Sequence, residues 1–265
     1  EAADAGVPAL GYVTDYGVLS SHLRALATAL PAKDTHSRAN LVVHAEGSSE
    51  DMQERSYGQE AVVALLGAAP AAGRTAFERF TPEGPLGLLP LESRYGMVWA
   101  MAPERARALC QAPAAEFLEA LARALGARAG NLTAVAERGR VPLALRVRRS
   151  RVGLREVFVG NAAQSLHPVA GQGLNLGLRD AWDLAQVLRD APDPGDERVL
   201  ARFAALRRLD ALATVRLTDL LASSFVGASA PGRFARGLGL AALDGCAPAR
   251  RFFARRMIFG ASAIP

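Results

Sequence analysis

Residues 160–180 read GNAAQSLHPVAGQGLNLGLRD, and three glycines fall within the seven residues 171–177. The run REVFVG at 155–160 comes directly before and predicts a short buried strand that ends at Gly160. After Gly173 the apolar residues recur at helical spacing. The stretch therefore predicts a strand, a glycine-rich turn and the N-terminus of a helix, in that order.

This order of elements indicates a ligand site. Gly171 and Gly173 allow backbone N–H groups to approach a ligand closely. The helix that begins near Asn175 directs the positive end of its dipole to the same place, which suits an anion or an electron-rich ring. A simpler interpretation is that the glycines only turn the chain and that His167–Pro168 only stiffens it.

The composition excludes several classes of protein. Half of the 265 residues are hydrophobic (50%), so the chain can bury a core. The net charge of +5 comes almost entirely from arginine, because Lys33 is the only lysine, and aromatic residues do not alternate with the arginines before the C-terminal end. We therefore expect no nucleic-acid partner.

The cysteines and the apolar runs bear on location. Cys110 and Cys246 are too far apart for a disulfide framework or a metal site, so we expect a reduced compartment and no metal. No secretion signal is present, and no run approaches the roughly 20 apolar residues of a spanning helix. The sequence predicts a cytoplasmic protein.

The chain before residue 160 mixes helical and strand patterns. Leucines at helical spacing predict a helix over 15–30, and LVVHAEG at 41–47 predicts a buried strand that enters a turn. Between 57 and 101, apolar runs separated by Pro and Gly predict a meander of antiparallel strands. A helix over 114–126 and a strand over 141–149 should follow.

The chain after residue 173 is helical in period, and PDPG at 192–195 is the clearest linker. For the first of these helices we expect a buried stripe made of Leu178, Ala181, Trp182, Ala185 and Leu188. The fold class predicted for the whole chain is mixed α/β.

The stretch 160–180 resembles the second flavin motif of the flavoprotein aromatic hydroxylases, which has the form GDAAH, then HP, then GQGxNxGxxDA. It is most similar to the 2-polyprenyl-6-methoxyphenol hydroxylases of ubiquinone biosynthesis. RTAFERFTPEGPLGLLPL at 74–91 resembles the substrate-domain strands of that family. RRLDALATVRLTDLL at 207–221 and CAPARRFFARR at 246–256 resemble its C-terminal helices. The likeness runs in order over nearly the whole chain.

The resemblance implies a partial FAD-binding domain of the aromatic-hydroxylase type, an antiparallel substrate sheet and C-terminal helices. In these terms, residues 1–50 are a remnant of the FAD-binding domain and residues 51–145 are the substrate-binding β-sheet domain. Residues 146–192 carry the second flavin motif, and residues 193–265 form the C-terminal helical region. FAD is the implied cofactor, NAD(P)H the reductant and O₂ a co-substrate.

The resemblance also implies roles for the residues of the motif. Gly160 and Asn161 stand where the family has Gly-Asp, whose Asp contacts ribityl or ribose hydroxyls of FAD, and an amide can still bond a hydroxyl. Five residues would present backbone amides to the pyrimidine edge of the flavin ring, namely Gly171, Gln172, Gly173, Leu174 and Asn175.

Catalytic roles are implied for the His-Pro step. Pro168 would lie beside the flavin ring, close to the place where substrate and oxygen meet. His167 would carry a proton, or, as the alternative, would only shape the turn. The chemistry belongs mainly to the cofactor, and the protein supplies binding, orientation and exclusion of water.

Two further segments differ from the family pattern. HAEGSS at 44–49 stands where the family has Asp-Gly, so Glu46 and Gly47 would contact FAD and the nicotinamide phosphate. The alternative for these two is a glycine turn with a solvated acid. Ser21 and His22 stand where the family often has an Arg or Gln that reaches the flavin.

The family's opening GxGxxG turn, which holds the FAD pyrophosphate, has no counterpart in these 265 residues. GLGLAA at 237–242 matches the pattern GxGxxA, but no predicted strand precedes it. We therefore interpret these small residues as a helix surface that packs against another element. We therefore expect weak FAD binding by this chain alone.

The segment ARRFFARRMIFG at 249–260 alternates arginines with large apolar residues. As a helix it predicts a basic amphipathic surface for anionic lipid, peripheral on the inner membrane, or, as the alternative, a helix docked on the core.

The function implied is hydroxylation of a polyprenylated phenol in ubiquinone biosynthesis, within a complex of ubiquinone-biosynthesis proteins. Two alternatives are a hydroxylase of a soluble aromatic compound and a non-catalytic remnant that binds no FAD alone.

Overall fold

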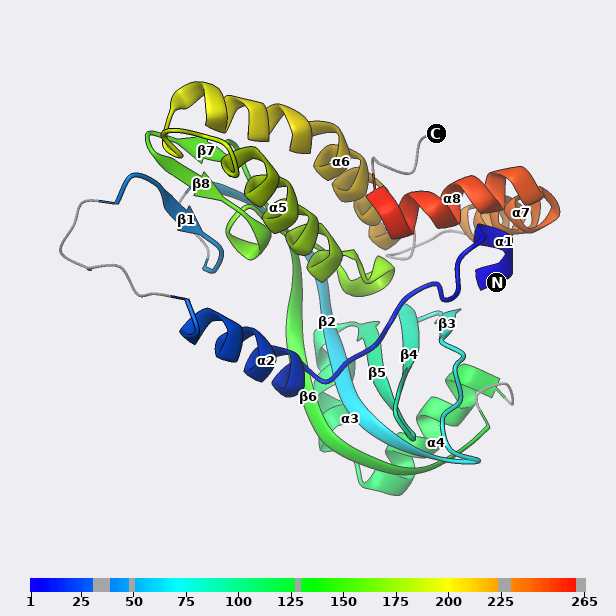
Figure 1. The fold of residues 1–265 in the computed structure, drawn as a ribbon. Helices are drawn as coiled ribbons and strands as arrows, with labels where there is room; N and C mark the ends of the chain where they lie inside the picture. Colours follow the sequence, from blue (N-terminus) through cyan, green and yellow to red (C-terminus); the bar gives the residue numbers. More distant parts are fainter. Residues whose placement is uncertain (31–38, 48–50, 127–129, 224–229, 261–265) are drawn as a thin grey trace. The chain divides into compact units, whose positions relative to one another are not determined.

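The computed structural model describes residues 1–30, 39–47, 51–126, 130–223 and 230–260 (Figure 1). The chain divides into two compact units. Unit 1 contains Glu1–Gly11, Asn40–Gly58 and Leu143–Pro265, and unit 2 contains Tyr12–Ala39 and Gln59–Pro142. Two long strands, β2 (Met52–Ala69) and β6 (Asn131–Arg148), contribute residues to both units.

Unit 2 is built on antiparallel strands. The sheet order is β3-β4-β5-β2-β6-β9, with β3 (Phe77–Phe80), β4 (Pro85–Leu91) and β5 (Arg94–Met101) in unit 2. The two-residue β9 (Gln164–Ser165) belongs to unit 1. Trp99 of β5 pairs with Leu86 of β4 on one side and Val62 of β2 on the other. Because side chains alternate between the two faces of a strand, these three residues point to the same side of the sheet.

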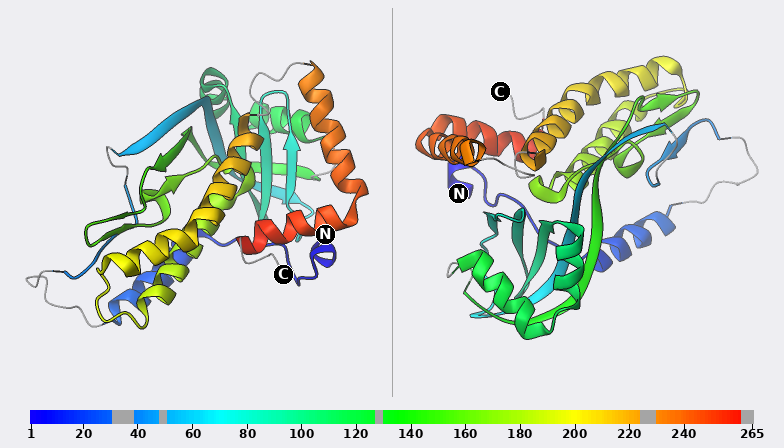
Figure 2. Two further views of the ribbon diagram at one scale, coloured as in Figure 1. Left: turned by 90° about the horizontal axis from the view of Figure 1, so that it is seen from above. Right: turned by 180° about the vertical axis from the view of Figure 1, so that it is seen from behind.

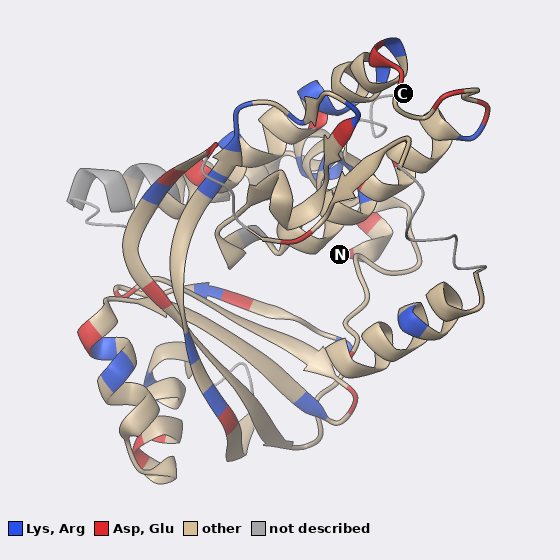
Figure 3. Cartoon of the chain, turned by 90° about the vertical axis from the view of Figure 1, so that its left-hand side faces the viewer, with Lys and Arg blue, Asp and Glu red and all other residues tan. Residues whose placement is uncertain are grey.

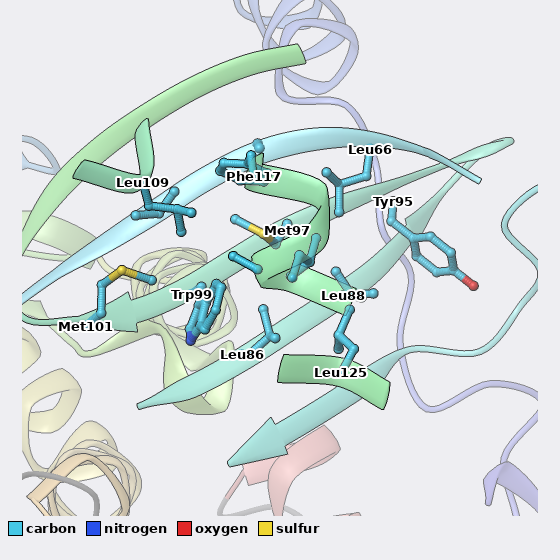
Figure 4. Close-up of a cluster of buried hydrophobic side chains, with 14 of the residues drawn as sticks. Leu66, Leu86, Leu88, Tyr95, Met97, Trp99, Met101, Leu109, Phe117 and Leu125 are labelled. Carbon is cyan, nitrogen blue, oxygen red and sulfur yellow. The ribbon is translucent and has the colours of Figure 1, made fainter. Parts of the chain in front are cut away.

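Two helices cover that side of the sheet, α3 (Pro103–Gln111) and α4 (Ala114–Leu125). Figure 4 shows their side chains packed on those of the strands, with Leu109, Phe117 and Leu125 among the labelled residues. Leu86, Phe117 and Leu121 have no exposed surface. Burying a side chain of this size contributes about 1.5–3 kcal/mol, so this cluster is the core of unit 2. Helix α2 (Tyr16–Thr28) also belongs to unit 2.

Unit 1 contains a three-stranded sheet in the order β1-β8-β7, with β1 (Val42–His44), β8 (Glu156–Phe158) and β7 (Val152–Gly153). β1 and β8 are parallel, and β7 is antiparallel to β8. Helices α5 (Gln172–Leu188) and α6 (Glu197–Ser223) pack side by side, as Figure 2 shows from two directions. Strand β8 and these two helices enclose an apolar cluster made of Val157, Val159, Leu184, Val187, Leu200 and Phe203.

Unit 1 also contains α7 (Ala230–Gly245), α8 (Ala247–Phe259) and the short α1 (Ala2–Ala5). α1 packs on α8, where Arg250 lies 3.4 Å from the Asp4 carboxylate and Arg251 Nε donates to the Asp4 carbonyl at 2.9 Å. In the described part of the chain, no helix has both the length and the apolar run that crossing a membrane requires.

Arginines of β6 pair with an acidic residue of β2 and with the acidic residue directly before that strand. Within unit 1, Arg146 lies 2.9 Å from Glu54 and Arg148 lies 3.0 Å from Asp51 (Figure 3). The Arg146–Glu54 pair is open to solvent and contributes little to stability, whereas the Arg148 side chain is mostly buried and lies over the Phe158 ring, 3.5 Å from its centroid. The two pairs show that part of the positive charge is neutralised across neighbouring strands.

The mixed α/β class with an antiparallel sheet is confirmed. The expected elements are present, but β1, predicted as a buried strand, has Val42 41% and Val43 47% exposed. β6 begins at Asn131, ten residues before the predicted 141, and β2 begins at Met52 instead of 57. The early part of β2 is mostly polar and exposed, and the early part of β6 is mostly exposed, with Leu132 and Val135 packed against the core. Neither part therefore contains the continuous apolar run by which the other strands were predicted. The 12 residues between the meander and α4 contain α3, which the sequence analysis did not predict.

The predicted buried stripe of α5 is wrong. Trp182 is 67% exposed and Leu178 is 54% exposed. The buried face instead carries Gln172, Leu176, Asp180, Leu184 and Val187. The helix has apolar residues on both its buried and its exposed side. Because the buried side also carries the polar Asp180, the exposed side has the more apolar stripe and was predicted as the buried one.

Candidate functional site

The site lies at one edge of the parallel pair β1 and β8. His44 is in register with Phe158, and the Val159 N–H donates to the His44 carbonyl at 2.9 Å. Because the strands are parallel, both end at the same edge, which is where ligands bind in open α/β sheets. The residues that follow β1 and β8 therefore meet there.

Two of the expected segments follow these strand ends. Glu46 and Gly47 come after β1, with Gly47 at φ +88°, and Gly160 and Asn161 come after β8, with Gly160 at φ +54°. A Cβ built on Gly160 would lie 3.6 Å from the Ala45 carbonyl oxygen, so the two turns are in contact distance. Glu46, Gly47 and Asn161 are exposed. Ser48 and Ser49 lie outside the described residues.

The loop between Gly160 and α5 is built from short turns. A 3₁₀ turn covers Gly160–Ala162, a two-residue strand β9 (Gln164–Ser165) pairs with β6, and a second 3₁₀ turn covers Pro168–Ala170. Pro168 occupies the first turn of the latter, where its missing N–H costs no hydrogen bond. The loop is therefore ordered by local bonds before it reaches the helix.

His167 is a buried part of this loop, with 1% of its surface exposed. Its Nδ1 accepts from the Val169 N–H at 3.0 Å, and its ring lies edge to face with Tyr57 at 5.0 Å. Burial lowers the pKa of His167 to about 4. The imidazole is therefore neutral at pH 7, with its proton on Nε2, for which the described residues provide no hydrogen-bond partner.

The N-terminus of α5 is free of capping side chains. Gly171 is the N-cap, at φ 58° and ψ 21°, and it has no side chain to bond the first N–H groups of the helix. A Cβ built on Gly171 or Gly173 would have nothing within 4 Å. Leu174 and Asn175 are exposed, whereas Gln172 is buried. Unbonded helix N–H groups beside open space can bind an anion or an electron-rich edge.

Helix α5 is held close to the Gly160 turn. A Cβ built on Gly177 would lie 3.3 Å from the Gly160 Cα, and the Gly160 N–H donates to the Asp180 carboxylate at 3.2 Å. These contacts join the turn after β8 to the second and third turns of α5. The sequence analysis assigned no role to Asp180, although it is the Asp of the quoted pattern GQGxNxGxxDA and stands at the helical spacing of Leu176 and Leu184.

The structure thus brings Glu46, Gly47, Gly160 and Asn161 together at one strand edge. It joins them to α5, which carries the Gly171–Asn175 amides at its N-terminus. Ser21 and His22 are exposed residues of α2 in unit 2. No group of three or more His, Cys, Asp or Glu side chains within the described ranges could hold a metal ion.

Comparisons with known proteins support one family. Residues 30–218 match the family model described as FAD binding domain. The chain is 36% identical over 231 residues to a ubiquinone hydroxylase, UbiL, of Rhodospirillum rubrum, covering 82% of this chain and 54% of the relative. It is 32% identical over 220 residues to the 3-demethoxyubiquinol 3-hydroxylase of Escherichia coli, covering 78% of this chain and 56% of the relative. The chain thus spans about half the length of the curated relatives it matches.

A solved structure shares the fold. The p-nitrophenol 4-monooxygenase PnpA of Pseudomonas putida superposes with a TM-score of 0.65 at 18% identity, covering 83% of this chain and 60% of that protein. At this identity the likeness concerns the fold alone.

Proposed function

The chain belongs to the FAD-binding domain family, and from that premise we propose that it forms the flavin-ring part of an FAD-dependent monooxygenase. The proposed reaction is hydroxylation of a polyprenylated phenol in ubiquinone biosynthesis, with NAD(P)H as reductant and O₂ as co-substrate. The names of the two bacterial relatives, a ubiquinone hydroxylase and a 3-demethoxyubiquinol 3-hydroxylase, support this pathway.

One observation carries the proposal. The glycine turns that follow β1 and β8 lie together at one strand edge, and the second of them contacts α5, whose N-terminus has no capping side chain. The exposed Asn161 amide can bond a sugar hydroxyl of FAD, and Gly160 leaves room for it beside Ala45. Glu46 and Gly47 lie at the same strand edge, where the Glu46 carboxylate can accept from another hydroxyl. These groups fit the polar part of the cofactor next to its ring.

The N-terminus of α5 fits the ring itself. The amides of Gln172, Gly173, Leu174 and Asn175 lie at the positive end of the helix dipole, and the two glycines leave space in front of it. The Gly171 N–H, expected to join them, instead donates to the Pro168 carbonyl at 2.8 Å. When bound, FAD supplies the redox chemistry that activates O₂. The α5 amides hold the ring in place and stabilise negative charge on its pyrimidine edge.

The His-Pro step then orients the loop. His167 holds the Val169 N–H and packs on Tyr57, which fixes the turn that carries Pro168. Of the two roles expected for His167, its burial and low pKa support the turn-shaping one. Pro168, half-buried at the start of the second 3₁₀ turn, would form a rigid wall beside the ring.

We propose that α8 approaches the lipid surface, where a polyprenyl substrate resides. Phe252 is 58% exposed and Phe259 is 39% exposed. Arg250 and Arg251 bond Asp4, and Arg255 bonds the Ala5 carbonyl and lies 5.3 Å from the centroid of the Phe259 ring. The arginines of α8 are thus engaged within the protein, and the exposed aromatic surface of Phe252 and Phe259 is what α8 offers to lipid. Association with other ubiquinone-biosynthesis proteins stays a prediction.

The substrate class is tested by genetics and assay together. Deletion of the gene should abolish ubiquinone and accumulate a prenylated phenol, and the full-length gene should restore the quinone. The purified full-length protein should oxidise NAD(P)H faster with a prenylated phenol than with the same phenol lacking the prenyl chain. Equal rates with both would favour a hydroxylase of soluble aromatics, and a protein that never binds FAD would favour a non-catalytic role.

A further inference from the structure

Buried charged side chains lie beneath the Gly160 turn. Asp180 of α5 has no exposed surface, and its carboxylate accepts from the Gly160 N–H at 3.2 Å. It also accepts from Gln164 Nε2 at 2.9 Å, from a terminal nitrogen of Arg151 at 3.0 Å and from Arg207 Nε at 2.8 Å. A main-chain group of the turn and three side chains therefore share one carboxylate.

Arg207 of α6 joins Asp180 to two further carboxylates. Its three nitrogens lie 2.8 Å from oxygens of Asp180, Asp183 and Asp210. Asp210 is also 3.0 Å from Arg179 Nε. Burial alone would raise the pKa of Asp210, but the charges of Arg179 and Arg207 hold that pKa below its usual value. Asp210 is therefore a charged carboxylate inside unit 1.

Apolar side chains dock α5 on α6 alongside this network. Leu184 and Val187 of α5 already pack with Leu200 and Phe203 of α6. Removing charges from water is so costly that apolar replacements of a buried ion-pair network are often equally stable. What apolar contacts cannot do is hold a polar main-chain group, such as the Gly160 N–H, in one direction. The network therefore supplies a directional contact with the turn that the apolar cluster does not provide.

We propose that Asp180 and Arg207 are positioning residues that fix the Gly160 turn against α5, and with it the contact of Gly160 and Asn161 with the cofactor. The inference rests on the proposed function, because the position of the turn matters to the chemistry only if FAD contacts it. Asp180 orients the Gly160 N–H, and Arg207 orients Asp180. Neither side chain needs to touch FAD.

The test uses two conservative variants in the full-length protein, Asp180→Asn and Arg207→Lys, and their double variant. Asn keeps the shape of Asp180 but loses its charge and one acceptor, and Lys keeps the charge of Arg207 but has one nitrogen for three carboxylates. Leu200→Ala is the matched control, because it removes packing from the same helix pair without touching the network. If Asp180→Asn does not fold, Arg207→Lys provides the test.

Three quantities are measured in each variant. Hydrogen exchange of the amides of residues 160–164, without FAD, reports the turn directly. The dissociation constant of FAD and the shape of the visible absorbance band of the bound flavin report the site. Each single variant should exchange about tenfold faster at these amides and bind FAD about tenfold more weakly, with an altered band. The double variant should be no worse than the more affected single variant, because both residues act through one contact.

Leu200→Ala should lower the melting temperature while loop exchange and FAD affinity stay within about twofold of the wild type. Folded network variants with wild-type exchange at 160–164 would overturn the inference, and so would a Leu200→Ala protein whose loop changes as much as theirs. A wild-type protein without FAD affinity would refute the proposed function alone, because the exchange measurement needs no cofactor.

Discussion

Gly160 and Gly177 are in direct contact, since a Cβ built on Gly177 would lie 3.3 Å from the Gly160 Cα. The second turn of α5 can approach the turn after β8 this closely because Gly177 has no side chain. Gly160 also has φ +54°, a conformation that other residues adopt at a cost. The placement of the turn therefore depends on two glycines as well as on Asp180.

Gly177→Ala should separate the turn from the helix. Overpacking of this kind costs about 1–3 kcal/mol, and the better helix propensity of Ala returns about 1 kcal/mol. We expect a net loss of about 1 kcal/mol in the free energy of unfolding together with weaker FAD binding, measured by denaturant unfolding and flavin titration. If the free energy of unfolding and the FAD affinity are both unchanged, the added Cβ fits between the turn and the helix, and the contact does not position the turn.

The pH dependence of stability should report on His167. Its pKa is about 4 in the folded protein and about 6.5 in an unfolded chain, so the unfolded state binds the proton at higher pH. The stability due to neutral His167 is therefore complete above about pH 6.5 and is lost as the pH falls toward 4. His167 should contribute about 1.4 kcal/mol per pH unit to the slope. Burial raises the pKa of Glu78 to about 7, and Glu78 contributes with the opposite sign, so the difference between wild type and a His167 variant is the quantity to measure.

In the His167→Gln variant the His167 contribution to the slope should be absent between about pH 6 and 5, as measured by denaturant midpoints at each pH. Equal slopes in wild type and variant would mean that His167 is accessible to protons in the folded state.

The 192–195 segment is held more tightly than a linker. Arg155 bonds both oxygens of Asp193, at 2.6 and 3.0 Å, and a Cβ built on Gly195 would lie 2.1 Å from the Asn40 carbonyl oxygen. Gly195→Ala should lower the free energy of unfolding by about 1–3 kcal/mol. Asp193→Asn should have a smaller effect, because the ion pair is open to solvent. Thermal unfolding of both variants measures the two losses of stability. A larger loss in Asp193→Asn than in Gly195→Ala would contradict the prediction.

Lipid binding should depend on the exposed aromatic residues of α8. The double variant Phe252→Ser/Phe259→Ser should reduce flotation of the full-length protein with anionic vesicles. Phe234→Ser on α7 is the matched control, since Phe234 is 73% exposed on the neighbouring helix. An effect of the control as large as that of the double variant would place the contact elsewhere.

Much of the fold could be predicted because its signals are local. The spacing of Phe117, Leu121 and Leu125 indicated α4, and the apolar run before Gly160 indicated β8. The early halves of β2 and β6 gave no such signal, since neither contains a continuous apolar run and their pairing is long-range. The assignment of residues 51–145 to a separate domain stays a prediction.

The glycines of the candidate site could be predicted from the sequence, but the side chains that hold the Gly160 turn in place could not. The motif around Gly171 marks a helix N-terminus by sequence alone. The partners of Asp180 are scattered from Arg151 to Arg207, and only the folded chain brings them together. The α5 stripe failed for the same reason, because Trp182 is more apolar than Asp180 and yet lies outside.

The central claim is that the N-terminus of α5 binds the flavin ring, and Gly173→Ala tests it most directly. The added Cβ meets no protein atom within 4 Å, so it should interfere only with a ligand. Gly237→Ala is the matched control, because its Cβ also meets nothing within 4 Å on another helix. We predict that, in flavin titrations of the full-length protein, Gly173→Ala weakens FAD binding about tenfold with an unchanged or higher melting temperature, while Gly237→Ala binds FAD like the wild type. Wild-type FAD affinity in Gly173→Ala would contradict the account.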